Sequence, residues 1–236
     1  MLQVLLQFEA QPEVTVEELA QAVSASVSTT YRYVALLREV GLVEERHRGR
    51  YSLSPRVLAL ARTAQAVSRI ASVSGPVLHR LTTDCGEAAI VVERLGELAV
   101  CVDIRQPDHP VRLSFVPGQV FPLHRGAAPK VLLAALGRDR ARAYLNRIDT
   151  MTAEERRRLG AELDEIRSKG WGESAAEVDQ GVWAVAAPVS VGGSVTAAVT
   201  VAAPDYRVDT GARERIRMLV RSAAKELTDA LALSRP

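Results

Sequence analysis

The chain has 236 residues, 25% of them charged, and a formal net charge of +2, so it is long enough for two domains and is no polycation that binds nucleic acid through its overall charge. No apolar run approaches the roughly 20 residues of a membrane span, and the first residues, MLQVLLQFEAQPE, lack the basic start and the cleavage site of a signal peptide. The two cysteines, Cys85 and Cys101, stand outside any CxxC pattern, which argues against a disulfide framework or a zinc knuckle, so we expect a cytoplasmic protein without metal or cofactor.

Two short helices with a tight turn between them are the first predicted elements. Thr15 and Glu18 form a capping-box pattern at the start of the first helix. Ser28 is a good N-cap for the second helix, and Gly41 is a typical end for it. This arrangement favours a helix-turn-helix. The expected buried face of the second helix consists of Tyr33, Leu36, Leu37 and Val40, and the outward face carries Ser28, Tyr31, Arg32, Ala35 and Arg38.

The pattern after Gly41 predicts two short strands, residues 42–44 and 51–53, around a basic loop. A helix-turn-helix followed by such a wing is a DNA-binding arrangement. Arginines can neutralise phosphates or read guanine, hydroxyls can meet phosphates or base edges, and a basic wing adds salt-sensitive affinity. The alternative is a small helical hairpin with a solvated basic loop. The predicted DNA contacts are Ser28, Thr29, Thr30, Tyr31, Arg32, Arg38, Arg46, Arg48 and Arg50.

A third helix is predicted from Pro55 to the pair Gly75-Pro76, about five turns in length, because small apolar residues recur there every three or four positions. Pro55 fits its first turn, where a missing N–H costs nothing. The apolar face suits contact with another helix, either across a dimer or within the same domain, and both remain open. The predicted domains are residues 1–54, the connector 55–74 and residues 75–236.

The rest of the chain mixes strands and helices, which favours an α+β sheet domain. The pair Gly192-Gly193 is a strong hairpin signal between two of the strands. A sheet with one covered face and loops around the other suits a small-molecule pocket. The predicted helices are 76–86, 126–137, 138–148, 152–170 and 209–233, and the predicted strands are 87–96, 98–106, 111–116, 181–191 and 194–204.

Three motifs occur in a specific order along the chain. They are STTYRYVALLREVGLVE (28–44), PGQVFPLHRGAAPKVLLAAL (117–136) and IRSKGWGESAAEVDQGVWAVAAPVSVGGSVTAAVTVAAP (166–204). With them the chain resembles the isocitrate-lyase-regulator (IclR) family of bacterial transcription factors over nearly its whole length. The resemblance implies an N-terminal winged helix-turn-helix, a connecting helix and a C-terminal GAF-like effector-binding domain with a mainly antiparallel sheet. It also implies a homodimer or homotetramer on pseudo-palindromic operators, and a first helix fuller than residues 2–8 provide.

The resemblance further implies where a small-molecule effector binds. Where members that bind small keto acids have an acid, a thiol and a hydroxyl, this chain has Ser174, Ala184 and Ala202. Amides at the start of the helix near residue 127 could still meet an anion. We therefore expect a ligand that is larger and less polar than glyoxylate or pyruvate, with a carboxylate end. The matched positions are Leu113 and Phe121 for an apolar wall, Ala127 and Ala128 for backbone amides, and Ser174, Ala184, Thr200 and Ala202.

Several side chains allow a structural and a functional interpretation. His124 fits a structural hydrogen bond better than a ligand or metal role. Trp183 fits the core better than ligand stacking. Glu177 and Asp179 either orient the pocket loop or belong to a solvated acidic loop. Cys101 alternates within a strand, so we expect it to be buried and inert.

The leading prediction for function is a one-component transcription regulator, whose effector changes operator affinity through the connector helix. An alternative is a small-acid-binding enzyme with an accessory helical domain. Against it, the acid and base candidates His124, Glu177 and Asp179 form no recognisable catalytic spacing, so no catalytic residue is predicted. A second alternative is an interaction module whose wing binds an acidic partner.

Overall fold

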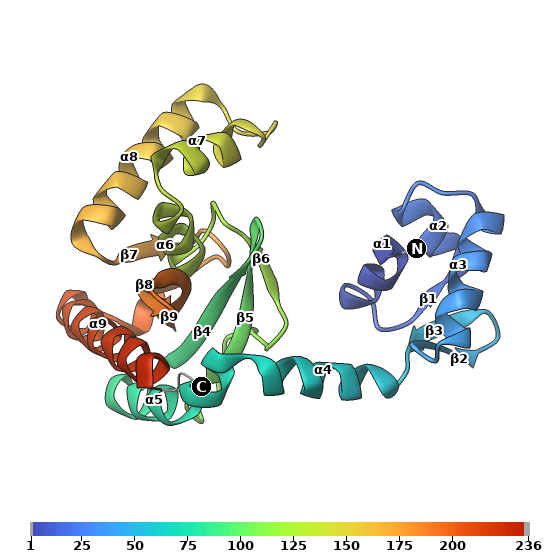
Figure 1. Ribbon diagram of the computed structural model, residues 1–236, viewed down its shortest axis with the longest axis horizontal. Helices are drawn as coiled ribbons and strands as arrows, with labels where there is room; N and C mark the ends of the chain where they lie inside the picture. Colours follow the sequence, from blue (N-terminus) through green and yellow to red (C-terminus); the bar gives the residue numbers. More distant parts are fainter. Residues whose placement is uncertain (1, 234–236) are drawn as a thin grey trace. The chain divides into compact units, whose positions relative to one another are not determined.

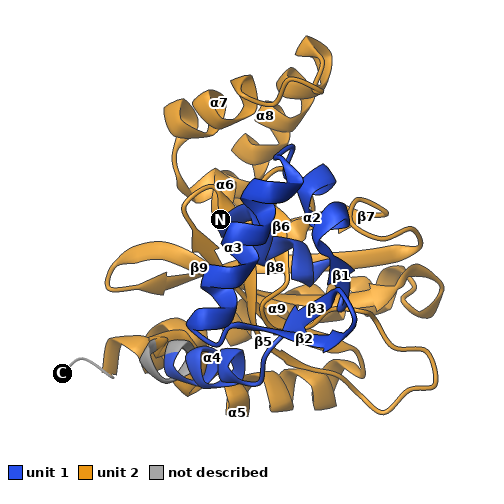
Figure 2. Ribbon diagram, turned by 90° about the vertical axis from the view of Figure 1, so that its right-hand side faces the viewer, with its two compact units in different colours: residues 1–67 blue, residues 68–236 orange. Residues whose placement is uncertain are grey.

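The computed structural model describes residues 2–233, except for the side chains of residues 64–67. The chain forms two compact units, Met1–Val67 and Ser68–Pro236 (Figures 1 and 2). The joint between the units lies inside the stretch predicted as a single connecting helix. Each unit has its own hydrophobic core, so each is described by itself. No helix in the described part of the chain is both long enough and apolar enough to cross a membrane.

The first unit is a winged helix-turn-helix, as predicted. Its sheet is antiparallel in the order β1-β3-β2. The capping box of Thr15 and Glu18 is present, with each side chain accepting a backbone N–H of the first turn. The elements are α1 (Leu2–Leu6), a 3-10 turn (Gln7–Glu9), β1 (Val14–Thr15), α2 (Val16–Ala22), α3 (Val27–Glu39), β2 (Val43–His47), β3 (Arg50–Leu53) and α4 (Arg56–Val67).

The start and the buried face of α3 differ from the prediction. The N-cap is Ser26 rather than Ser28, because the Oγ of Ser26 accepts the N–H of Thr29 at 3.2 Å. The buried stripe consists of Thr30, Val34 and Leu37. It packs toward the core that α2 and the small sheet share. The stripe predicted from apolar spacing was wrong in part, because it passed over a threonine whose hydroxyl is satisfied within the helix. Leu36 and Val40 are about half exposed and Tyr33 is half-buried.

The helix predicted from Pro55 to residue 75 is divided in two at Ser68. Helix α5 (Arg69–Cys85) begins there, because the Oγ of Ser68 accepts the N–H of Ala71 at 3.3 Å and its backbone is extended. Pro76 lies inside α5 instead of ending a helix, and Gly86 ends α5 in the left-handed conformation with φ +72°. The predicted helix over 76–86 is therefore the second half of α5.

The second unit is built on one six-stranded antiparallel sheet in the order β6-β5-β4-β9-β8-β7. Residues 111–116 form no strand, and this prediction was wrong. Their apolar residue Phe115 packs into the core from an irregular segment, while Val120–Pro122 pairs with β5 at the sheet edge. The strands are β4 (Ala88–Leu95), β5 (Leu98–Arg105), β6 (Val120–Pro122), β7 (Gly172–Ala175), β8 (Val182–Val191) and β9 (Ser194–Pro204).

Helices cover both faces of this sheet (Figure 1). Because side chains alternate along a strand, odd-numbered residues of β4 and β9, such as Val91 and Val199, pack against α5 and α9 (Thr210–Leu233). Even-numbered residues, such as Ile90 and Ala198, belong to the other core. That core includes α6 (Ala127–Ala135), α7 (Arg138–Asn146) and α8 (Ala153–Lys169), the last opened by the predicted capping box of Thr152 and Glu155.

Helix α9 offers a matched pair of leucines for testing the core under the sheet. Leu227 is fully buried and Leu233 is 87% exposed. Leu227→Ala should lower the free energy of unfolding of this unit by about 2–5 kcal/mol, because it leaves a cavity, while Leu233→Ala should change it little. Urea unfolding followed by tryptophan fluorescence measures this unit alone, since Trp171 and Trp183 both lie in it. Equal losses for both variants would contradict the packing described.

Candidate functional site

The outward face of α3 holds four of the nine predicted contact residues, Ser28, Tyr31, Arg32 and Arg38. Ser28, Tyr31 and Arg32 are exposed. In the described part of the chain, Arg32 has no carboxylate partner, whereas Arg38 lies 3.6 Å from Glu45. This face is therefore open to an outside partner at its start and internally paired near its end.

Two of the predicted hydroxyl contacts are not free. Thr30 is fully buried and its Oγ1 donates to the carbonyl of Ser26 at 3.0 Å, so its side chain cannot reach DNA and this prediction was wrong. Thr29 is half-buried, and its Oγ1 accepts a hydrogen bond from the hydroxyl of Ser26 at 2.8 Å. Ser28 is the hydroxyl that stays exposed at the start of α3.

The wing is a tight hairpin that presents arginines to solvent. Gly49 takes φ +74° at the turn, and its N–H donates to the carboxylate of Glu45 at 3.0 Å. Arg46 is 2.8 Å from Glu44, while Arg48 and Arg50 have no carboxylate partner among the described residues.

Positive charge is concentrated toward the end of this unit. Residues 1–31 contain four glutamates and no lysine or arginine, whereas residues 32–67 contain seven arginines and three glutamates. The sum over the unit is zero, but the second part, which includes most of α3 and the wing, has a net charge of +4. Local clustering of this kind is the electrostatic footprint of a nucleic-acid contact.

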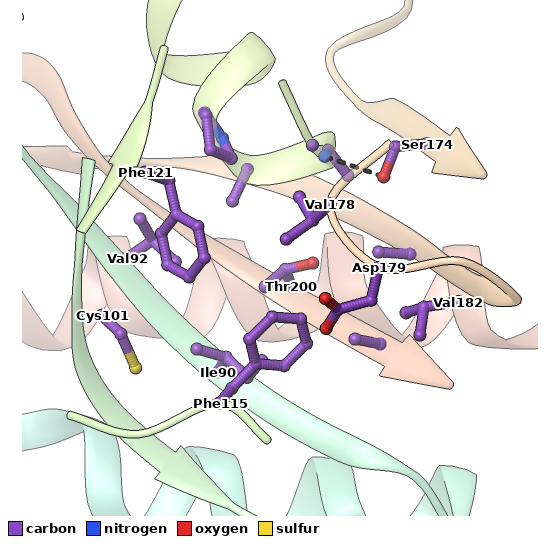
Figure 3. Close-up of a pocket in the computed structure, with 16 residues that line it drawn as sticks. Ile90, Val92, Cys101, Phe115, Phe121, Ser174, Val178, Asp179, Val182 and Thr200 are labelled. Atoms are coloured by element: carbon purple, nitrogen blue, oxygen red, sulfur yellow. Dashed lines mark hydrogen bonds between the residues drawn. The ribbon is translucent and has the colours of Figure 1, made fainter. Parts of the chain in front are cut away.

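A second candidate site is a pocket on the even-numbered face of the large sheet (Figure 3). The space between its lining atoms is about 520 Å³, a figure that includes the part open to solvent. Phe115 and Phe121 form one wall, with ring centroids 5.9 Å apart in an edge-to-face pair. The other lining residues are Ile90, Val92, Cys101, Gly126, Ala127, Ala128, Pro129, Ser174, Val178, Asp179, Val182, Ala184, Thr200 and Ala202.

Seven of the eight predicted effector contacts line this pocket: Phe121, Ala127, Ala128, Ser174, Ala184, Thr200 and Ala202. Leu113 does not line it; this residue packs at the edge of the core beside the segment that carries Phe115. The sequence analysis did not predict Phe115 or Val178, because neither an irregular segment nor a loop has a periodic pattern. It assigned Asp179 to the pocket loop, and Asp179 lines the pocket. Cys101 lines the pocket with a buried thiol, and burial raises its pKa to about 12, so it is not a reactive nucleophile.

The loop that carries Val178 and Asp179 is fixed to the start of α6 by Glu177. One carboxylate oxygen of Glu177 accepts the N–H of Gly126 at 2.9 Å, and the other is 2.5 Å from the ammonium of Lys130. Arg125 also donates to the backbone carbonyl of Glu177. We call residues 176–181 the roof loop, because they close the pocket above the sheet. Glu177 thus orients the pocket loop, which was one of its two predicted interpretations.

Lys130 is buried in α6, with only 1% of its surface exposed. Its ammonium is paired with Glu162 of α8 as well as with Glu177. An unpaired ammonium in such a place would cost several kcal/mol, so the two carboxylates are required partners. The three side chains therefore join α6, α8 and the roof loop into one framework.

Two polar groups at the start of α6 face the pocket without a complete set of hydrogen bonds. The N–H of Ala127 is already used, because it donates to the Oγ of Ser174 at 3.0 Å. The buried N–H of Ala128 has no hydrogen bond in the described part of the chain. The hydroxyl of Ser174 also donates to no acceptor among the described residues, whereas Thr200 donates its hydroxyl hydrogen to the carbonyl of Val185 at 2.8 Å. Ala128 and Ser174 are thus the donors available to a ligand.

His124 and Trp183 have structural roles, which was the preferred interpretation of each. The Oη of Tyr144 accepts the N–H of Leu123 at 3.0 Å and lies 3.0 Å from the Nδ1 of His124. This hydroxyl therefore contacts both the backbone of Leu123 and the imidazole of His124. Trp183 lies on the odd-numbered face of the sheet, away from the pocket, with the guanidinium of Arg213 over its ring at 5.4 Å.

Gly126, the N-cap of α6, lies against the roof loop. Its φ is +93°, and a Cβ there would lie 2.9 Å from Cγ2 of Val178. Gly126→Ala should therefore displace the roof loop and lower the unfolding midpoint more than Gly137→Ala does. Gly137 has φ +85° but open space around it, so it controls for backbone strain alone. In a double variant, Val178→Ala should restore the unfolding midpoint lost by Gly126→Ala, but not the midpoint lost by Gly137→Ala. Equal changes in the urea midpoint for the two glycine variants would contradict the contact.

The environment of His124 predicts a pH effect on stability. Burial, followed by the charge of Arg125, lowers the pKa of His124 below its ordinary value of 6.5. The folded state therefore binds this proton less readily than the unfolded state, and it loses stability as the pH falls below about 6.5. His124→Gln should lack this pH-dependent loss of stability. The difference in free energy of unfolding between wild type and variant should therefore shrink from pH 7 to pH 5. Parallel curves in pH-dependent urea unfolding would contradict the prediction.

Comparison with known proteins gives the family of the chain. Residues 1–47 match the IclR helix-turn-helix domain, and residues 63–229 match the domain described as bacterial transcriptional regulator IclR C-terminal. The HTH-type transcriptional regulator KdgR of Escherichia coli is 29% identical over 92% of this chain and 85% of its own length. The HTH-type transcriptional regulator Rv1719 of Mycobacterium tuberculosis is 32% identical over 80% of this chain and 74% of its own.

Solved structures have the same fold. An IclR transcriptional regulator from Alicyclobacillus acidocaldarius superposes with a TM-score of 0.81 at 22% identity, covering 97% of this chain and 95% of its own. An IclR homologue from Microbacterium hydrocarbonoxydans, solved in complex with 4-hydroxybenzoate, has a TM-score of 0.78 at 19% identity and covers 99% of both chains. The chain therefore belongs to the IclR family of bacterial transcriptional regulators.

Proposed function

We propose that a carboxylate-bearing effector binds in the pocket of the second unit and changes the affinity of the winged helix for an operator. Like its curated relatives, the chain is a DNA-binding transcriptional regulator and not an enzyme. The observation that supports an effector most strongly is the apolar pocket, in which the buried backbone N–H of Ala128 has no partner among the described residues. Buried N–H groups in folded proteins are almost always paired, so a ligand acceptor completes the site.

The carboxylate of the effector fits the start of α6. Helix N-termini carry partial positive charge and unpaired N–H groups, both of which favour an anion. Here the N–H of Ala128 and the hydroxyl of Ser174 are the available donors. The apolar remainder of the ligand lies between Phe121 and the sheet residues Ile90 and Val92. Because the structural relative with 4-hydroxybenzoate has the same fold, that compound is the first probe to try.

Residues 55–74, which span α4 and the start of α5, are proposed as the connector between residues 1–54, which bind DNA, and residues 75–236, which bind the effector. Helix α4 exposes Leu58 and Leu60 to 66% and 56%. We propose that a second copy of the chain covers them in a homodimer, which can pair further into a tetramer. A dimer matches the two half-sites of a pseudo-palindromic operator. We also propose that the protein works in the cytoplasm, where such an operator lies.

Two substitutions separate the proposed roles of the units. Arg32→Ala should weaken binding to operator DNA by about 1–3 kcal/mol, the usual cost of losing an arginine contact, and leave acid binding unchanged. Phe121→Ala should do the reverse, because it removes one wall of the pocket. Gel shifts with the intergenic DNA beside the gene, and calorimetry with a set of aromatic acids that starts with 4-hydroxybenzoate, measure the two effects.

Matched controls exist for both variants. Arg215 is an exposed arginine on α9 and Tyr206 is a 76% exposed aromatic residue in the same unit as Phe121; alanine at either position should change neither measurement. Equal losses of DNA and acid binding in Arg32→Ala or in Phe121→Ala would contradict the division of roles. Failure of every acid to bind the wild-type protein would contradict the carboxylate-bearing effector.

A further inference from the structure

A groove between α7 and α8 concentrates positive charge in the second unit (Figure 1). Its volume is about 490 Å³, and it shares no lining residue with the pocket on the large sheet. Asp164 is the one acidic residue among the described residues that line it, so the lining has a net charge of +4. The five arginines of the lining are Arg138 and Arg142 of α7 and Arg156, Arg157 and Arg167 of α8.

Most of this charge is not neutralised inside the groove. Asp164 serves two of the arginines at once, because it lies 3.0 Å from Arg138 and also binds Arg167. Arg142 and Arg156 form no ion pair among the residues that the structure describes. Clustered positive charge of this kind attracts anions from solution. An anion can bind here without displacing a carboxylate from Arg142 or Arg156.

Two of the guanidinium groups are held in place by backbone carbonyls. Arg156 donates to the carbonyl of Leu145 at 3.1 Å and to that of Ile148 at 2.8 Å. Arg167 donates through Nε to the carbonyl of Ala134 at 2.8 Å. Both arginines are half-buried. A carbonyl fixes a guanidinium without cancelling its charge, and each guanidinium has further N–H donors. These two groups are therefore oriented before an anion arrives.

Gly160 leaves the middle of the groove open. It lies inside α8, where a glycine is less favourable for the helix than an alanine. A Cβ at this position would meet no atom within 4 Å, so close packing does not explain the glycine. Gly160 follows Arg156 and Arg157 by about one helical turn. The missing side chain thus keeps space free beside two of the arginines.

We propose that this groove binds a small molecule that carries phosphate groups. A phosphate offers three oxygens that accept hydrogen bonds, and arginine binds it through two N–H groups at once. Several guanidiniums can therefore share one phosphate, whereas a carboxylate has only two oxygens. Because Arg156 and Arg167 are half-buried, a compact anion reaches them more readily than the backbone of a DNA duplex. The regulator then has a second small-molecule site, which does not depend on an acid in the sheet pocket.

Calorimetry on the full-length protein tests this site with pyrophosphate as the probe. The variant Arg142→Gln/Arg157→Gln should bind pyrophosphate roughly tenfold or more weakly than the wild type, the usual effect of losing hydrogen bonds to a charged group. Arg157 is paired only with Glu154, and both side chains are exposed, so its loss should cost the fold little. The control Arg140→Gln/Arg158→Gln removes the same charge from exposed positions of α7 and α8 outside the groove, and should keep the affinity.

Gly160→Leu tests the same site without a change of charge. The leucine should fill the groove and weaken pyrophosphate binding several-fold, whereas Ala161→Leu, at an exposed position outside this groove, should not. The unfolding midpoint of Gly160→Leu should be at least that of the wild type, because leucine is the better helix former. Weaker binding with an unchanged fold then reports a blocked groove.

Four results would overturn the inference. They are no binding of pyrophosphate to the wild type, equal losses in the two arginine double variants, equal losses in the two leucine variants, and citrate that binds as tightly as pyrophosphate and is lost equally in Arg142→Gln/Arg157→Gln. Weaker binding of the intergenic DNA by this variant would assign its arginines to the operator and would also overturn it. Each of these results leaves the proposed effector of the sheet pocket untouched, since that proposal is tested by aromatic acids and Phe121→Ala.

Discussion

The alternation of side chains along the strands of the large sheet determines what each part of the second unit can do. Because neighbouring residues point to opposite faces, Val199 and Val201 fill the core under α5 and α9, whereas Thr200 and Ala202 between them line the pocket. A shift of the strand by one residue would place valines in the pocket and a hydroxyl in the core. The many alanines on the pocket face leave the space that larger side chains would fill. The pocket is thus a direct result of strand register and side-chain size.

A second constraint acts above the sheet, where no regular strand or helix forms the cover. The carboxylate of Glu177 holds the roof loop in place instead, because it binds the N–H of Gly126 and the ammonium of Lys130 at once. Because Lys130 is buried, its ammonium needs both Glu162 and Glu177. Loss of either carboxylate would leave the buried charge without full compensation. The roof loop is therefore more rigid than its irregular backbone indicates.

Much of this structure could be predicted from the sequence, and the failures have physical causes. Both capping boxes, the Gly192-Gly193 hairpin and the last helix have local signals, and all were correct. The prediction of Thr30 as a DNA contact was wrong because a polar residue can be buried when its hydroxyl bonds the backbone of its own helix. The break at Ser68 was hidden by apolar spacing that continues across it. The family resemblance located seven pocket residues, but Phe115 and Val178 lie in loops, whose paths depend on tertiary contacts.

The pairing of charges on α3 and the wing bears on how this protein meets the phosphate backbone. Arg38 and Arg46 already carry glutamate partners, whereas Arg32, Arg48 and Arg50 have none among the residues that the structure describes. When a phosphate binds Arg38 or Arg46, it replaces a glutamate that already neutralises the arginine. Fewer counterions are therefore released from the duplex than five unpaired arginines would release. The protein would thereby lose less affinity as ionic strength rises. Glu44 and Glu45 would also repel a misplaced backbone, which makes the wing a means of setting position as much as a source of attraction.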